Sequence, residues 1–125
     1  MKRFVLAAAL CAATAAAAQD AYVIGVSAAM TGPAAATYAP VVESMKAYLD
    51  HVNQRGGVNG KQIKLVVYDD SAQPSRAAAN TKRLLAEDDV VLLMNSSLSS
   101  TYAPMVAEAI PASTGPRSPW ASKPG

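Results

Sequence analysis

Three short apolar runs, separated by helix-forming stretches, constrain the fold of this chain more than any other feature of its sequence. The runs lie at residues 22–26, 63–68 and 90–94 and are rich in valine, isoleucine and leucine. Runs of this length and composition are typical of buried parallel strands. Because a helix-forming stretch follows each run, we predict an α/β fold with three parallel strands and flanking helices in βαβαβα order.

Turn and cap signals predict where the helices begin and end. The turn at residues 31–33 precedes the first helix, and the glycine pair 56–57 ends it, since glycine suits the left-handed position after a helix. The apolar stripe predicted for this helix consists of Val41, Val42, Met45, Tyr48, Leu49 and Val52. The pair Asn59-Gly60 predicts a turn into the second strand. The second helix is predicted at residues 74–87, and the third begins near Thr101.

A cluster of hydroxyl side chains follows the third predicted strand, within the sequence SSLSST at residues 96–101. In open parallel sheets, ligands bind beyond the carboxyl ends of the strands, where the predicted loop 31–38 also lies. A helix N-terminus there offers unpaired N–H donors to an anion. The sequence therefore predicts a site for a carboxylate or another small anion. Helix capping by the same hydroxyls, without a ligand, is the alternative.

The other polar residues give no signal for catalysis or metal binding. Asp69 and Asp70 are adjacent at a strand end, so their side chains project in opposite directions, and we predict structural or solvated roles for both. His51 has no recognisable serine or cysteine partner motif, so we predict that it is solvated. The glycine pairs precede a strand rather than a helix, which is not the pattern of a phosphate-binding loop. We therefore expect no metal and no other cofactor.

Residues 1–18 have the pattern of a signal peptide. Lys2 and Arg3 precede an apolar segment at residues 4–15, which is shorter than the roughly 20 residues that a membrane-spanning helix needs. The alanines before Gln19 offer a cleavage site, so we predict export to the periplasm with cleavage near residue 18. An alanine-rich buried helix is the alternative.

Cleavage at this point would leave a neutral chain. Without Lys2 and Arg3, nine basic and nine acidic residues remain. A neutral chain has no electrostatic attraction for nucleic acid or for an anionic membrane, so we expect no nucleic-acid partner. The only cysteine, Cys11, would leave with the signal peptide, so we expect no disulfide.

The sequence changes character after residue 109. Residues 110–125 contain four of the eight prolines and show neither a helical nor a strand period. We therefore predict that residues 19–109 form the folded region and that 110–125 form a disordered or aberrant tail, which interrupts the third helix. Trp120 is predicted to be exposed within this tail.

Four segments, in order, resemble the periplasmic ligand-binding receptors of branched-chain amino acid ABC transporters, which are type I periplasmic binding proteins. They are residues 24–33, 53–61 (NQRGGVNGK), 68–74 and 99–101. The resemblance implies two Rossmann-like lobes joined by a hinge, with the ligand in the cleft between them. It covers residues 21–109, so the expected fold is a truncated member, the N-terminal part of the first lobe. Because the expected fourth strand is replaced by the tail, we hypothesise a frameshifted or mispredicted end.

The resemblance also implies which residues contact the ligand. In the family, the segment rich in serine and threonine after the third strand contacts the ligand carboxylate, and a polar residue of the first loop faces the cleft. That first loop is one residue longer here, so Thr37 and Tyr38 are alternatives. The predicted ligand-binding residues are Ser97, Ser99, Ser100, Thr101, Thr37 and Tyr38.

The function that the resemblance implies is an extracytoplasmic solute-binding receptor, not an enzyme. It would bind an amino acid or a related small carboxylate and deliver it to the membrane permease of an ABC transporter. An exported ligand-sensing module on the same fold is the alternative, because fold does not fix function. An exported serine hydrolase is less well supported, since the sequence has no G-x-S-x-G elbow and no recognisable triad histidine.

Overall fold

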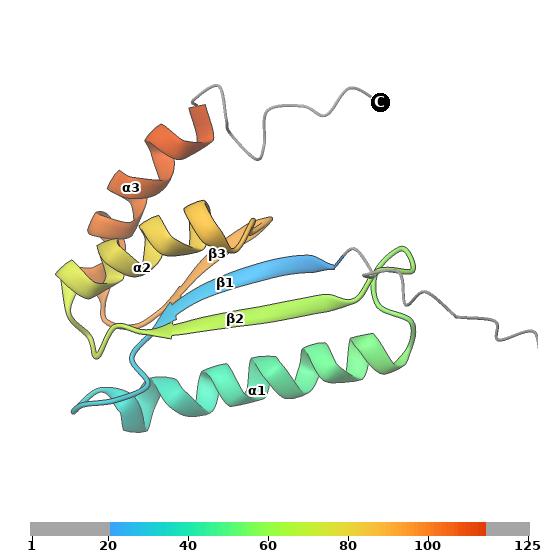
Figure 1. Ribbon diagram of the computed structural model, residues 1–125. Coiled ribbons are helices and arrows are strands. Elements are labelled where there is room, and N and C mark those ends of the chain that lie inside the picture. Colours follow the sequence, from blue (N-terminus) through green and yellow to red (C-terminus); the bar gives the residue numbers. More distant parts are fainter. Residues whose placement is uncertain (1–20, 115–125) are drawn as a thin grey trace, which may run out of the picture.

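The computed structural model describes residues 21–114, which form a three-stranded sheet with helices on both faces (Figure 1). The strands are β1 (Tyr22–Ala28), β2 (Ile63–Asp69) and β3 (Leu92–Ser96), and the helices are α1 (Ala35–Gln54), α2 (Pro74–Glu87) and α3 (Tyr102–Thr114), with the short 3-10 helix η1 (Ser99–Thr101) before α3. Helix α1 covers one face of the sheet, and α2 and α3 lie on the other. The predicted signal peptide, residues 1–18, lies outside the described residues.

The sheet confirms the predicted α/β fold. Its strand order is β2-β1-β3, and both pairings are parallel. The third strand begins at Leu92, two residues later than predicted. Val90 lies before the strand and is buried, and the Val91 N–H already donates to the Val23 carbonyl at 2.8 Å. The apolar run therefore includes the residues that lead into the strand.

The sheet is packed differently on its two faces. On the α1 face, Val26 and Ala28 pack with Val42 in the buried core. On the α2 face, β1 presents Gly25, where an added Cβ would lie 2.8 Å from Val90 Cγ1 and 2.9 Å from Leu84 Cδ2. The absence of a side chain at this position lets α2 and the residues before β3 approach the central strand closely.

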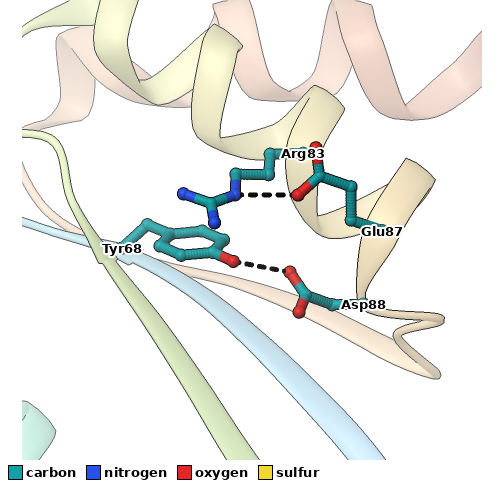
Figure 2. A network of polar contacts seen from close by, with 4 residues as sticks. All are labelled: Tyr68, Arg83, Glu87 and Asp88. Atoms are coloured by element: carbon teal, nitrogen blue, oxygen red, sulfur yellow. Dashed lines mark hydrogen bonds and ion pairs between the residues drawn. The ribbon is translucent and has the colours of Figure 1, made fainter.

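A polar cluster holds α2 on the outer strand β2 (Figure 2). The Tyr68 hydroxyl donates to Asp88 at 2.9 Å, and the Arg83 guanidinium carbon lies 4.4 Å from the centre of the Tyr68 ring. Arg83 Nε also donates to Glu87 at 3.0 Å. The hydrogen bond to Asp88 raises the pKa of the Tyr68 hydroxyl, and the bond to Glu87 raises the pKa of Arg83. Tyr68 therefore stays protonated and Arg83 stays charged at neutral pH.

The predicted apolar stripe of α1 is wrong at two positions. Val42 and Leu49 are buried, but Val41 is 50% exposed and Tyr48 is 67% exposed. The helix contacts the sheet along a narrower face than its pattern of apolar residues suggests. The predicted loop 31–38 is also too long, because α1 begins at Ala35, in a stretch of alanines that favours helix.

The third helix continues past its predicted end at residue 109. Helix α3 extends to Thr114 and contains Pro111, so the prediction of a tail without helix is wrong for residues 110–114. Its packing against α2 explains the difference, since Lys82 and Glu108 form an ion pair at 3.3 Å and Leu85 and Ala112 line a common groove. The rest of the predicted tail, with Trp120, lies outside the described residues.

Candidate functional site

The carboxyl ends of the three strands form one row. Ala28 of β1 pairs with Asp69 of β2 on one side and with Ser96 of β3 on the other. The connections that follow the three strands therefore emerge at the same edge of the sheet, at the left of Figure 1. This is the edge where ligands bind in open parallel sheets. The site predicted from the sequence lies here.

One buried carboxylate joins all three strand ends. Asp70 is fully buried, and its Oδ2 accepts a hydrogen bond from the Ser27 hydroxyl of β1 at 2.8 Å. Its Oδ1 accepts from the Ser97 hydroxyl after β3 at 2.7 Å and from the Ala72 N–H at 2.8 Å. A buried carboxylate is costly unless its oxygens are satisfied, and here three donors satisfy them. The structural role predicted for Asp70 is confirmed.

Asp69 organises the first two connections in the same way. It accepts hydrogen bonds from the N–H groups of Met30 and Thr31 at 2.9 and 3.1 Å, and also from the Thr31 hydroxyl. Ser71 donates to it from both its N–H and its hydroxyl, at 2.9 and 3.0 Å. Burial alone would raise the pKa of Asp69, but the hydrogen bonds from Thr31, Ser71 and Met30 outweigh it and hold the pKa well below its usual range.

The two aspartates also hold a strained turn. Ser71 and Ala72 have φ angles of 48° and 61°, in the left-handed region that non-glycine residues rarely adopt. Asp69 accepts from the Ser71 N–H, and Asp70 accepts from the Ala72 N–H, each two residues ahead. These two bonds compensate for the strain, and α2 begins directly after this turn.

A second set of hydrogen bonds closes the turn between β3 and α3. Asn95 donates from Nδ2 to the Thr101 hydroxyl at 2.8 Å and accepts the Ser97 N–H at 2.9 Å. The Thr101 hydroxyl donates in turn to the Leu98 carbonyl at 2.7 Å. Asn95 therefore binds both ends of the turn that carries the predicted site, which we call the hydroxyl turn, residues 97–101.

The hydroxyl turn separates the four predicted residues into two pairs. Thr101 is fully buried, and Ser97 is half-buried with its hydroxyl bonded to Asp70. Ser99 and Ser100 are exposed, and within residues 21–114 neither hydroxyl makes a hydrogen bond. The capping alternative is not observed for this pair, since η1 has no side-chain cap. Two hydroxyls therefore face solvent beside the start of a helix.

Backbone donors lie next to these two hydroxyls. The Thr101 N–H donates to the Leu98 carbonyl at 3.0 Å, and the Tyr102 N–H donates to the Ser99 carbonyl. The N–H groups of Ser99 and Ser100 precede these bonds, as the first donors of a helix do. The exposed part of the hydroxyl turn thus offers hydroxyl and amide donors from the same two residues.

Thr37 and Tyr38 lie at the same edge but on another element. Both belong to the first turns of α1, with Thr37 exposed and Tyr38 half-buried. In the described part of the chain, no hydrogen bond joins either side chain to the hydroxyl turn. The structure therefore brings Ser99 and Ser100 together and leaves Thr37 and Tyr38 as a separate group.

Three residues of this edge were missed by sequence reasoning: Ser27, Asn95 and Arg76. Ser27 is a polar residue within an apolar strand, and Asn95 directly precedes the serine cluster, so both were visible as exceptions to the strand pattern. Arg76 donates to the Ser71 hydroxyl at 3.0 Å from the first turn of α2, and nothing in its sequence surroundings indicates this.

The remaining candidates have no role at this edge. His51 is exposed on α1, as predicted. Among residues 21–114, no three histidine, cysteine, aspartate or glutamate side chains are grouped so that they could hold a metal ion. No helix in the same range is long and apolar enough to cross a membrane. A groove of about 460 Å³ between α1 and β2 is lined by Met30, Val42 and Leu65, among others, and by none of the predicted ligand residues.

Comparison with known proteins identifies similar sequences. The model of the periplasmic binding protein family matches residues 21–122, which extends past the end of the resemblance predicted near residue 109. An amino acid binding protein of Pseudomonas aeruginosa is 33% identical over 82 residues, which are 66% of this chain and 22% of that protein.

Solved structures share the fold. The branched-chain amino acid transporter substrate binding protein LivJ from Streptococcus pneumoniae, in complex with isoleucine, superposes with a TM-score of 0.69 at 27% identity, over 73% of this chain and 26% of that one. A possible leucine/isoleucine/valine-binding protein from Rhodopirellula baltica gives 0.68 at 26% identity, over 74% and 25%. A solute binding protein of an ABC transporter from Rhodopseudomonas palustris, in complex with 3,4-dihydroxybenzoic acid, gives 0.60 at 26% identity, over 77% and 25%. The chain spans about a quarter of the length of these relatives.

Proposed function

The chain belongs to the periplasmic binding protein family, and we propose that it forms one wall of an extracytoplasmic receptor site for an amino acid or a related small carboxylate. The observation that carries the proposal is the exposed pair Ser99 and Ser100, whose hydroxyls make no hydrogen bond within residues 21–114. The pair lies at the carboxyl edge of the sheet and at the start of a helix, where an anion is stabilised by N–H donors.

A carboxylate has the chemistry that this pair can bind. Each of its oxygens accepts hydrogen bonds, and the Ser99 and Ser100 hydroxyls and N–H groups only need to donate. Charge-assisted bonds of this kind contribute about 1.5–3 kcal/mol each. In this proposal Ser97 and Thr101 do not touch the ligand, because their hydroxyls already bond to Asp70, Asn95 and Leu98. They hold the pair in place.

The ligands named for the relatives support a carboxylate as the shared feature. One solved relative holds isoleucine and another holds 3,4-dihydroxybenzoic acid. These molecules differ in size, shape and polarity, but both carry a carboxyl group. A wall of hydroxyl and amide donors suits that common group, and Thr37 or Tyr38, at the start of α1, is proposed to contact the remainder of the ligand.

We assign no catalytic role to the hydroxyl turn. A serine nucleophile needs a nearby base, and the only histidine of the sequence, His51, lies exposed on α1. The relatives are named as binding proteins. The proposed partners are therefore a small-molecule ligand and, in the periplasm, the membrane permease of an ABC transporter.

The proposal is tested by titrating the 125-residue chain with isoleucine while recording backbone amide chemical shifts. One wall leaves much of the ligand in water, so we expect weak binding, with a Kd on the order of 1 mM. The shifts that move are expected to be those of Ser99, Ser100 and their neighbours. Leucinamide, which lacks the carboxylate, is the matched ligand and is expected to leave these shifts unchanged.

A substitution separates the site from general effects. Ser99→Ala removes one charge-assisted bond and is expected to weaken binding about tenfold, since about 1.4 kcal/mol corresponds to a factor of ten. Ser44→Ala is the control, because Ser44 is exposed on α1 and its hydroxyl bonds only to the Pro40 carbonyl. Equal responses to isoleucine and leucinamide, or an unchanged affinity in Ser99→Ala, would contradict the proposal.

A further inference from the structure

Exposed apolar side chains are concentrated on one side of the molecule. Of the nine large apolar side chains that are exposed in residues 21–114, six belong to β3, α3 or the residues next to them, with exposed fractions from 38% to 62%. These six are Val91, Leu92, Leu98, Tyr102, Val106 and Ile110. A groove of about 170 Å³, lined by Leu93, Met94 and Met105 among others, runs between β3 and α3 and connects them. We call this surface, β3 with the outer face of α3, the β3 surface.

The β3 surface also contains an open strand edge. Strand β3 is the outer strand of the sheet, paired only with β1 among the described strands. An outer strand presents a row of N–H and C=O groups that another strand can pair with. The partner that satisfies both the backbone edge and the apolar side chains is therefore an extended strand accompanied by apolar residues.

The two outer strands differ in charge. The outer strand β2 carries Lys64 and Asp69, which is how natural outer strands discourage further pairing. No charged residue occurs from Val90 to Ala107, and Glu108 is paired with Lys82 of α2. The β3 edge has no such protection.

The absence of charge favours a second copy of this chain as the partner. In a two-fold symmetric contact the same patch meets itself, so every charge on the patch would lie near its own copy. A patch without charges avoids this repulsion, and here it also supplies its own complement, an uncharged strand. We propose that β3 of one copy pairs antiparallel with β3 of a second copy and forms a continuous six-stranded sheet.

The helices of the two copies fit this arrangement. A two-fold axis perpendicular to the sheet leaves both α3 helices on the same face. Tyr102, Val106 and Ile110 are spaced by four residues, so they lie along one side of α3 and can pack against the same side of its copy. The carboxyl edges of the two copies then point in opposite directions. This inference does not depend on the proposed ligand.

The test is the oligomeric state of the 125-residue chain, measured by sedimentation velocity over a range of concentrations, together with amide hydrogen exchange of β3. We expect a monomer–dimer equilibrium in which the β3 amides are protected in the dimer and exchange faster after dilution. Leu92→Lys places two like charges at the proposed contact and is expected to raise the dimer dissociation constant at least 100-fold. Tyr102→Lys, on the surface of α3, is expected to act in the same direction without altering the strand.

Tyr48→Lys is the matched control, because Tyr48 is exposed on α1, on the other face of the sheet, and the dimer should persist. A dimer that neither Leu92→Lys nor Tyr102→Lys weakens would overturn the proposal. A monomer with protected β3 amides would also overturn it, since another segment of the same chain would then cover the edge. A monomer with unprotected β3 amides, or assemblies that grow with concentration, would exclude the closed dimer.

Discussion

Two connections at the same edge of the sheet differ in how their polar groups are used. Between β2 and α2, the carboxylates of Asp69 and Asp70 accept every donor around them, and the Ser71 hydroxyl is bonded as well. Between β3 and α3, the hydroxyls of Ser97 and Thr101 are bonded inside the protein, whereas those of Ser99 and Ser100 are exposed. The first connection is completely satisfied, and the second is satisfied only on its inner side.

This difference shows how a rigid site can be built from flexible residues. The Ser97 hydroxyl donates to Asp70, so the second connection rests on the first. Asp70 is in turn bonded to Ser27 of the central strand. The exposed pair is thereby linked to the core through two hydrogen bonds, and such support reduces the cost of ordering these residues when a ligand binds.

Asp70→Ala is expected to have the largest effect, because it breaks the link between the two connections. It leaves the buried donors of Ser27 and Ser97 without an acceptor, which we expect to lower the free energy of unfolding by about 3 kcal/mol. Urea unfolding followed by circular dichroism measures this loss. Asp50→Ala, which removes an exposed carboxylate from α1, should change stability by less than about 0.5 kcal/mol. Equal effects in the two variants would show that Asp70 does not join the strand ends.

The second prediction concerns Asp69 and acid. Its pKa is lower in the folded chain than in the unfolded chain, where it is about 3.9. Its contribution is therefore complete above pH 4 and is lost as the pH falls from there toward the folded value. We expect Asp69→Asn to be less stable than the parent chain at pH 7 and to lose less stability between pH 5 and pH 3. Urea midpoints at several pH values measure this, and parallel curves for the two proteins would contradict it.

Asn95→Ala is expected to have a smaller effect that is confined to the hydroxyl turn. The substitution removes the acceptor of the Ser97 N–H and the donor to the Thr101 hydroxyl, so we expect a loss of about 1–2 kcal/mol. Hydrogen exchange should become faster at Ser97 and Thr101 but not at Ala72, whose acceptor is Asp70. Faster exchange at all three amides would show that the two connections open as one unit.

The strands and helices could be predicted because their signals are local. The apolar runs, the glycine pair 56–57 and Pro74 act on neighbouring residues, and the structure places β1, β2 and α2 where those signals indicate. Exposure of Tyr48 could not be predicted in the same way. Whether a residue at the margin of an apolar stripe is buried depends on what the helix packs against, which the helix's own sequence does not contain.

The division within the hydroxyl turn was also beyond a sequence argument. Ser97, Ser99, Ser100 and Thr101 are chemically alike, and only the course of the backbone decides which hydroxyls turn inward. That course depends on Asp70, which lies 27 residues before Ser97, and on Ser27, a further 43 residues before Asp70. Long-range pairing of this kind leaves no periodic signal in the sequence.

The smallest expected effect on stability is the one that most directly tests the difference within the turn. Replacing both Ser99 and Ser100 by alanine removes two exposed hydroxyls without internal partners, so stability should change by less than about 0.5 kcal/mol. Thr101→Val keeps the shape of the side chain but removes a buried hydroxyl with two partners, and should cost about 1 kcal/mol or more. Unfolding of both variants in urea measures the contrast. If the double alanine variant lost as much stability as Thr101→Val, the exposed pair would be part of the fold rather than a surface left open for a ligand.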